Sequence, residues 1–159
     1  MIVILDTGIL SLLCHPNSDK NPEVHQCLNW FQSSLMKGQL PVSSAICEYE
    51  LRRKLIQQSL KGEHLPAKAL EKLDSLLEFI DFLSVTRDVL VNAAEIWAEL
   101  RNSGQATASD TNLDADCILG AHYRLSKKES PGRKIIIVTT NVRHLNRFAD
   151  AKSLQDIAS

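Results

Sequence analysis

Three acidic residues that are far apart in this chain stand where strands are expected to end or helices to begin. Asp6 closes an apolar run, Glu50 lies one to two turns into a helix-like segment, and Asp116 is near the start of a later one. Uninterrupted Ile, Val and Leu are typical of buried parallel strands, and open α/β sheets hold ligands at the carboxyl ends of such strands. Carboxylates, completed by water and substrate phosphate oxygens, can hold Mg²⁺. The three acids therefore predict a metal site at one sheet edge.

Two of these acids have an acidic neighbour two positions earlier, which leaves the choice of ligand open. Glu48 precedes Glu50 and Asp114 precedes Asp116. On a helix this separation rotates side chains by roughly 200°, so only one of each pair can face a given site. The ordinary alternative for Glu48 and Glu50 is an exposed ion pair with the basic residue four positions later. Asp116 could instead stabilise its helix by placing a negative charge near the positive, N-terminal end of the helix dipole. Asp110 and Asp114 could form an auxiliary acidic patch.

The elements that must position these acids alternate between strand-like and helix-like patterns. We expect strands at residues 2–5, 40–43, 82–85 and 134–138, and a short edge strand within 151–157. We expect helices at residues 22–37, 45–60, 66–80, 88–102 and 113–125, and a last one beginning near residue 142. Polar residues 104–112 and charged residues 126–134 are expected to be loops. Alternating strands and helices with short connections predict a parallel sheet covered by helices on both faces.

Composition places the chain among globular proteins with one domain. Its 159 residues, 44% of them hydrophobic, are enough for one core, and we expect a single domain over residues 1–159. No apolar stretch approaches membrane-spanning length and no signal-peptide pattern opens the chain, so a cytoplasmic protein is expected. The four cysteines and five histidines lack the close spacing of zinc or disulfide frameworks, so we expect reduced, mostly buried cysteines. A net charge of −1 gives no overall basic signature for nucleic acid.

Four segments, in this order, resemble the PIN-domain nucleases and most closely the VapC-type toxins of toxin–antitoxin pairs. They are Ile4-Leu5-Asp6-Thr7-Gly8-Ile9-Leu10, residues 44–53 (SAICEYELRR), Asp116-Cys117-Ile118-Leu119-Gly120-Ala121 and residues 138–145 (VTTNVRHL). The resemblance implies a three-layer α/β/α sandwich with a mainly parallel sheet. It also implies an endoribonuclease that uses Mg²⁺ or Mn²⁺, a homodimer, and a small antitoxin partner that covers the active site.

The resemblance also assigns the site residues. Asp6, Glu50 and Asp116 match the family's first three acids, and the residues that follow Glu50 and Asp116 select them over Glu48 and Asp114. Asn141 falls where the family has Asp or Asn, and Thr139 where it has a hydroxyl residue. The metal would then be held by Asp6, Glu50 and Asp116. Asn141 and Thr139 would complete the catalytic set, unless they only cap the helix that follows.

Gly8 and Asn141 depart from the family pattern. Gly8 replaces a frequent Asn, and Asn141 supplies a neutral oxygen where an acid would bind metal more strongly. Asn141 keeps open a second hypothesis, a catalytically inactive PIN-like module that binds nucleic acid or regulates. A third, phosphotransfer through an aspartyl nucleophile at Asp6, is disfavoured because Gly8 stands where a second acid is usual.

Tryptophan, histidine and arginine side chains outside the catalytic set also have expected roles. Trp30 and Trp97 lie on apolar helical stripes, Trp97 together with Leu90, Ala94 and Arg101, and both are expected in the core, with a dimer or antitoxin interface as the alternative. The lone histidines His122 and His144 are expected to be structural. Candidates for steering substrate phosphates are basic residues within or just after the motif segments, where a solvated surface role is the alternative: Arg52, Arg53, Arg143 and Arg147.

Overall fold

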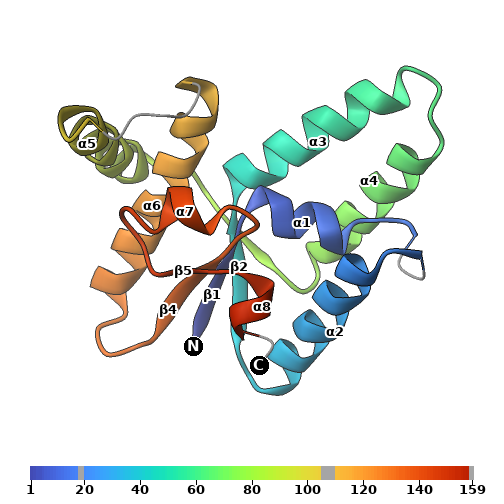
Figure 1. Cartoon of the computed structure of the whole chain (residues 1–159), viewed down its shortest axis with the longest axis horizontal. Helices are drawn as coiled ribbons and strands as arrows, with labels where there is room; N and C mark the ends of the chain where they lie inside the picture. Colours follow the sequence, from blue (N-terminus) through green and yellow to red (C-terminus); the bar gives the residue numbers. More distant parts are fainter. Residues whose placement is uncertain (18–19, 105–109, 158–159) are drawn as a thin grey trace.

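The computed structural model describes residues 1–17, 20–104 and 110–157, and the side chains of residues 110–113 lie outside the description. Helices and strands alternate along the chain (Figure 1). The strands are β1 (Ile2–Leu5), β2 (Leu40–Ser44), β3 (Asp81–Leu83), β4 (Ile135–Val138) and β5 (Ala151–Lys152). The helices are α1 (Thr7–Leu13), α2 (Pro22–Met36), α3 (Ala45–Ser59), α4 (Leu65–Leu76), α5 (Arg87–Asn102), α6 (Asp110–Glu129), α7 (Val142–Leu145) and α8 (Leu154–Ile157).

In the described part of the chain the strands form one five-stranded sheet in the order β3-β2-β1-β4-β5, and every pairing is parallel. From β1 the chain builds outward to β2 and β3, and β4 then returns to the other side of β1. The strand order therefore reverses between β1 and β4, where Leu5 is in register with Val138. Open α/β sheets hold ligands beyond the carboxyl ends of strands at such a reversal. The expected three-layer α/β/α sandwich with a mainly parallel sheet is confirmed.

Helices cover both faces of the sheet, with α5 and α6 on one side and α1 to α4 on the other (Figure 1). The central strands β1 and β4 are buried along their whole length, as a parallel sheet between two helical layers requires. A second apolar cluster joins the inner faces of α5 and α6. In the described residues no helix is both long and apolar enough to cross a membrane.

Most elements lie where the sequence predicts them, and the differences are mainly at their ends. Helix α6 extends to Glu129, into the segment expected to be a loop, and α4 ends at Leu76 rather than near Ile80. Strand β3 begins one residue earlier than expected. The short edge strand within residues 151–157 is β5, and α8 follows it. Helix α1 was not predicted, because Asp6 was treated only as the end of a strand. All four cysteines are buried and unpaired, as expected.

The prediction for α5 was wrong about which of its faces is buried. The face packed against α6 carries Val89, Ala93, Ile96 and Leu100, whereas the predicted stripe of Leu90, Ala94, Trp97 and Arg101 is one residue out of register. Trp97 is consequently 39% exposed, whereas Trp30 is buried as expected. Because α5 has two adjacent apolar stripes, helical periodicity alone could not decide which one faces the core.

Candidate functional site

The Asp6 side chain is held in place from both of its oxygens. Asp6 is the N-cap of α1, and its Oδ1 accepts a hydrogen bond of 2.9 Å from the backbone N–H of Ile9. Its Oδ2 accepts a hydrogen bond from the hydroxyl of Thr139, which is buried at the end of β4. The backbone N–H of Asn141 donates to the same Thr139 hydroxyl at 2.8 Å. Burial raises the pKa of Asp6 despite these hydrogen bonds, because they do not fully offset the cost of removing the charged carboxylate from water.

Glu50 reaches the same region from α3. Its Oε2 accepts a hydrogen bond of 2.8 Å from the Thr7 hydroxyl, at the first position of α1. Arg53 lies 3.9 Å from its other carboxylate oxygen. Glu48 has a different role, because it pairs with Arg52 at 2.9 Å. The two glutamates thus point in different directions, as a separation of two residues on a helix requires.

Asp116 approaches from α6 and is affected by the other two acids. Burial, followed by the negative charges of Asp6 and Glu50, raises its pKa to about 7, and the positive charge of Arg147 opposes this rise. The imidazole Nδ1 of His144 lies 3.8 Å from Asp116 Oδ2. Asp114 is exposed and faces a separate groove between α5 and α6. The suggested patch with Asp110 lies outside the described side chains.

The three acids line one pocket of about 170 Å³, which opens at the edge of the sheet where the strand order reverses. Its wall is formed by residues of the helices α1, α3, α6 and α7 and by the N-cap residues of α1 and α7: Asp6, Thr7, Cys47, Glu50, Ala115, Asp116, Leu119, Asn141 and His144. Thr139 lies beneath this wall as the buried donor to Asp6. The structure therefore brings together the five residues that the sequence predicts for the catalytic set: Asp6, Glu50, Asp116, Asn141 and Thr139.

The donor chemistry of this pocket fits a hard divalent cation. The negative charges of Asp6 and Glu50 raise the pKa of Asp116, so a cation bound in the pocket would offset the repulsion among the three carboxylates. In the described part of the chain, no three His, Cys, Asp or Glu side chains converge closely enough to ligate one ion together. Mg²⁺ usually takes only one or two carboxylates directly and keeps several waters. The pocket therefore suits a largely hydrated ion, with the other acids acting through water.

Three pocket residues with polar or sulfur-containing side chains were not recognised as site residues from the sequence: Thr7, Cys47 and His144. Thr7 directly follows Asp6, so its place at the start of a helix could have been a signal. Cys47 precedes Glu50 by three residues, which places both on the same side of α3. His144 was expected to be structural, but it lines the pocket beside Asp116. His122, by contrast, is buried away from the pocket lining, and burial lowers its pKa to about 4.

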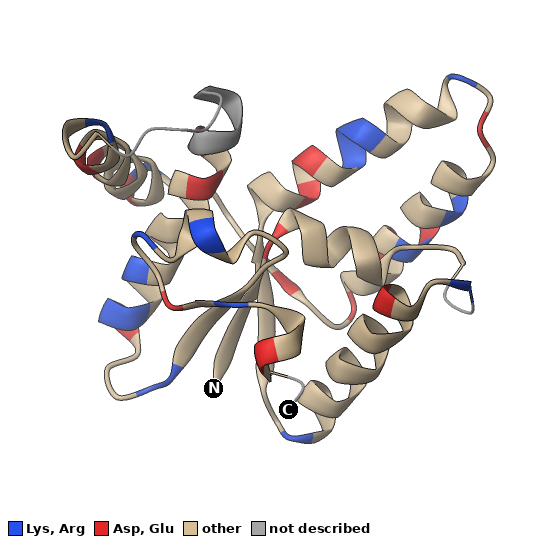
Figure 2. Cartoon of the chain, viewed as in Figure 1, with Lys and Arg blue, Asp and Glu red and all other residues tan. Residues whose placement is uncertain are grey.

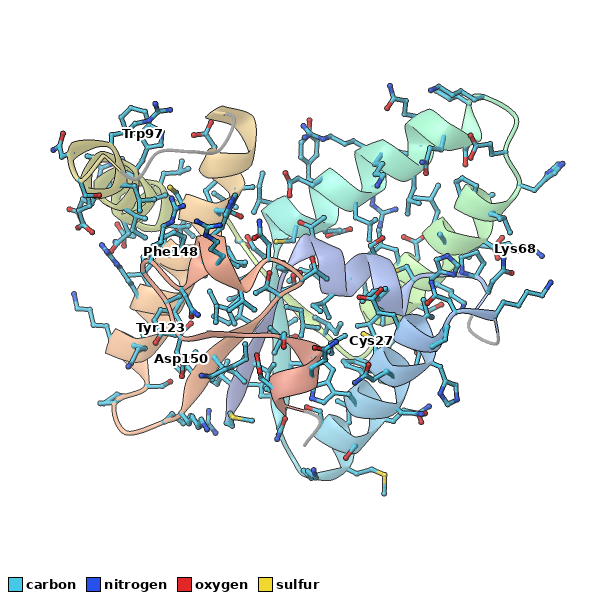
Figure 3. All side chains as sticks on the ribbon, in the orientation of Figure 1. Cys27, Lys68, Trp97, Tyr123, Phe148 and Asp150 are labelled. Atoms are coloured by element: carbon cyan, nitrogen blue, oxygen red, sulfur yellow. The ribbon has the colours of Figure 1, made fainter. Side chains whose placement is uncertain are left out.

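Two glycines allow the segments around the pocket to approach one another. A Cβ atom on Gly8 would overlap the side chain of Thr140, so the Asn frequent at this position in PIN domains would not fit without rearrangement. A Cβ atom on Gly120 would overlap the ring of Phe148, which packs against α6 (Figure 3). Gly8 therefore reflects the close approach of α1 to the segment after β4.

The basic residues near the site differ in their availability to a substrate. Arg52 is held between Glu48 of α3 and Asp74 of α4, the latter at 2.7 Å. Arg143 is exposed on α7, where its neighbour His144 lines the pocket, and Figure 2 shows a basic segment on this helix. Arg147 is close enough to lower the pKa of Asp116. Arg143 and Arg147 are thus better placed than Arg52 to meet a phosphate.

Comparison with known proteins identifies the fold. No family model matches the chain, and no curated protein matches it in sequence. Among solved structures, VapBC2 of Rickettsia felis bound to a promoter DNA fragment matches with a TM-score of 0.67 and 17% identity, covering 96% of this chain and 98% of that one. VapBC-1 of nontypeable Haemophilus influenzae matches with a TM-score of 0.64 and 16% identity, covering 98% and 99%. DNA-bound VapBC of Salmonella typhimurium matches with a TM-score of 0.61 and 16% identity, covering 97% and 98%.

Proposed function

We propose that this chain, which has the fold found in VapBC toxin–antitoxin structures, is a metal-dependent endoribonuclease and the toxin of such a pair. The observation that carries the proposal is the pocket itself. Asp6, Glu50 and Asp116 come from three separate parts of the chain, and they lie close enough that two of them raise the pKa of the third. A cluster of this kind at a strand-order reversal is suited to cation-assisted chemistry on a phosphodiester.

In this proposal Asp6, Glu50 and Asp116 hold Mg²⁺ or Mn²⁺, directly or through water. When bound, the ion supplies Lewis acidity for activating water and for stabilising negative charge at the scissile phosphate. The hydroxyl of Thr139 and the N–H of Ile9 fix Asp6. The hydroxyl of Thr7 orients Glu50. Asn141 offers a neutral oxygen at the pocket wall, and Arg143 and Arg147 attract the phosphate backbone.

The direct test is cleavage of a mixed set of structured RNAs by the purified protein with Mg²⁺ or Mn²⁺, beside an EDTA control. Asp6→Asn and Asp116→Asn should each abolish cleavage. Asp114→Asn is the matched control, because Asp114 lies on the same helix but is exposed and faces a different groove. Equal cleavage by all variants would indicate a contaminating nuclease.

The second candidate is a PIN-like module that binds nucleic acid or regulates without catalysis. The neutral Asn141 favours it, because a fourth acid would strengthen metal binding. Calorimetric titration with Mn²⁺ separates the two candidates. Metal binding that Asp6→Asn weakens, together with cleavage, supports the nuclease; RNA binding without metal binding or cleavage supports the inactive module.

The partners of the chain belong to the same proposal. The three matched structures are named as VapBC assemblies, so we propose that a small antitoxin binds this chain and blocks its pocket. An endoribonuclease toxin would act on RNA in the cytoplasm. Co-expression of the chain with the product of an adjacent small gene, followed by co-purification, tests the pairing.

A further inference from the structure

Residues 139–141, which follow β4, separate the acid pocket from a second and larger cavity. Asn141 lines the acid pocket, whereas Thr139 and Thr140 line the second cavity, which has a volume of about 520 Å³. Its other walls are the first two turns of α2 and the residues around the start of α8, two helices that lie side by side (Figure 1). We call this cavity the α2–α8 pocket. Its volume is typical of sites that hold a small organic group.

The accessible side chains of the α2–α8 pocket are amides, a hydroxyl and one carboxylate. Glu23 and Gln26 are three residues apart on α2, which places them on the same side of that helix. Thr140 lines the pocket from the end of β4, and Gln155 lines it from α8. All four residues are exposed, so a ligand in the pocket can reach them. Together they offer hydrogen-bond donors and acceptors.

Helix capping fixes the backbone that carries these side chains. Asn21 caps α2, and its side-chain oxygen accepts a hydrogen bond of 3.0 Å from the N–H of Glu23. At the start of α8, the Asp156 carboxylate accepts from the N–H of Ser153 at 3.0 Å and from its hydroxyl at 2.7 Å. The Ser153 hydroxyl accepts in turn from the N–H of Asp156 at 3.2 Å. The walls of the pocket are therefore preformed, which reduces the entropy lost when a ligand binds.

The charges in the α2–α8 pocket favour a neutral polar ligand over a phosphate. Among the described residues that line it, Glu23 is the only one that is charged at neutral pH, so no cationic side chain is present to neutralise a phosphate. Glu23 lies in the first turn of α2, so a negative charge already occupies the positive end of that helix. Amide, hydroxyl and carboxylate groups are those that read the edges of unpaired nucleobases.

We propose that the α2–α8 pocket binds one base of the RNA substrate, next to the bond that is cut, and that this base is guanine. The Watson–Crick edge of guanine has two adjacent N–H donors, at N1 and N2, and the Glu23 carboxylate can accept both. Gln26 and Thr140 supply donors for the guanine O6 and N7 acceptors. Adenine, cytosine and uracil do not have two adjacent donors on this edge, so a carboxylate discriminates against them.

The position of the pocket explains why the base lies next to the bond that is cut. The proposed function places the scissile phosphate in the acid pocket, beside Asp6 and Asn141. The α2–α8 pocket starts at the preceding residue, Thr140, and Thr139 donates to Asp6 from the same segment. An RNA strand can therefore cross residues 139–141 with a phosphate on one side and a base on the other. The inference rests on the proposed function for this placement and adds a sequence preference, which phosphate contacts do not supply.

The first test measures binding and does not depend on cleavage. In an Asp6→Asn background, fluorescence anisotropy compares short single-stranded RNAs that contain only uridine except for a central guanosine, inosine or adenosine. The guanosine RNA should bind at least about fivefold more tightly than the adenosine RNA, with inosine, which lacks the N2 donor, between them. Glu23→Gln should bring the three affinities to within about twofold, because an amide cannot accept both hydrogen bonds. Equal affinities before this change, or no binding, would overturn the proposal.

Asp88→Asn is the matched control for Glu23→Gln. Asp88 is also an exposed acid in the first turn of a helix, but α5 lies on the other face of the sheet (Figure 1). Both changes remove a favourable interaction with a helix dipole, so urea denaturation should show similar small losses of stability. Asp88→Asn should keep the preference for guanosine. A preference that both variants lose would reflect net charge rather than the pocket, and would overturn the proposal.

The second test locates the base relative to the cut. The unmodified chain cleaves a random-sequence RNA pool with Mn²⁺, and sequencing of the product ends should show guanine enriched at one fixed position beside the cut. Glu23→Gln should remove this enrichment. If no RNA is cut but guanosine RNA is still preferred in binding, the nuclease proposal fails and the pocket is supported as the base site of a binding module. Cleavage without a guanine preference in either assay would overturn the pocket assignment alone.

Discussion

The hydroxyl of Thr139, the first residue after β4, donates a hydrogen bond to Oδ2 of Asp6, the first residue after β1. The two residues are 133 positions apart in the sequence, and the register of Leu5 with Val138 brings them together. Asp6 is thereby fixed by the sheet on one oxygen and by the start of α1 on the other. The position of this carboxylate therefore depends on the pairing of β1 with β4, a strand that the chain forms only after β2 and β3.

Thr139→Val should weaken both the fold and the site. Valine has nearly the shape of threonine but lacks the donor, so Asp6 would lose one of its hydrogen bonds in a buried setting and its pKa would rise further. We expect a loss of about 1–3 kcal/mol in the free energy of unfolding at neutral pH, measured by urea denaturation. RNA cleavage should fall in parallel, and Thr139→Ser should restore both. If Thr139→Val is as stable and active as the parent, the hydrogen bond has no such role.

The raised pKa of Asp116 predicts a specific dependence of stability on pH. Its pKa is 3.8 in the unfolded chain and about 7 in the folded chain, so between these values the folded state binds more protons than the unfolded state. The contribution of this carboxyl to stability is therefore fully present below about pH 4, falls as pH rises toward 7, and then levels off. Burial raises the pKa of Asp6 as well, which acts in the same direction.

Asp116→Asn should remove this dependence at position 116. We expect the variant to be more stable than the parent at pH 8, by up to a few kcal/mol (about 1.4 per pKa unit), and by only about 1 kcal/mol at pH 4.5. Chemical denaturation at the two pH values measures the difference. Asp114→Asn, which changes an exposed acid on the same helix, should show no such pH-dependent gain, and an equal gain in both variants would contradict the assignment.

A divalent cation should stabilise the protein more at high pH than at low pH. Ionised Asp6, Glu50 and Asp116 repel one another, and a bound cation offsets that repulsion only after protons have left the pocket. The rise in melting temperature on adding Mn²⁺ should thus be larger at pH 8 than at pH 5.5, and Asp6→Asn should reduce it. A rise that is independent of both pH and Asp6 would place the ion elsewhere.

The sequence predicted which acids lie close together better than it predicted the faces of the outer helices. Buried strands such as residues 135–138 are easy to recognise because every residue is apolar. Once residues 2–5 are recognised as such a strand, Asp6 is placed at its carboxyl end. Helix α5 was different, because Leu90, Ala94 and Trp97 form a second apolar stripe next to the one that is buried. Which stripe faces inward depends on how α5 packs against α6, a tertiary relationship that local periodicity does not contain.

Residues that complete the pocket were missed for a related reason. His144 lies near Asp116 only because α7, which follows β4, packs against α6. Nothing close to His144 in the sequence indicates an acid nearby. The helical start at Thr7 was hidden because Asp6 fitted the end of a strand and is also the N-cap of α1. Asp6 therefore has two structural roles, following β1 directly and capping α1, and the sequence pattern indicates only the first.

Gly8→Ala tests the close approach of α1 to the segment after β4. The added Cβ would overlap the Thr140 hydroxyl and would also lie only 3.2 Å from Thr140 Cβ, which rotation of that side chain does not move. We expect a loss of about 1–3 kcal/mol in the free energy of unfolding. Combining Gly8→Ala with Thr140→Ala should recover most of the loss, so the double-mutant cycle should show strong coupling. Additive effects of the two changes would show that Thr140 is not the obstacle.

Arg147 and Arg52 should differ in their effect on RNA binding, although the sequence makes both candidates for contact with substrate phosphates. Arg147 acts electrostatically on Asp116 in the pocket, whereas Arg52 is occupied by Glu48 and Asp74. In an Asp6→Asn background, which prevents cleavage, Arg147→Gln should weaken binding of single-stranded RNA and reduce the slope of log affinity against log salt by roughly 0.7, the value for one lost phosphate contact. Arg52→Gln, the matched control, should lower stability by about 1 kcal/mol and leave RNA affinity nearly unchanged. Fluorescence anisotropy over a series of salt concentrations measures both quantities, and equal effects of the two variants would exclude a specific role for Arg147.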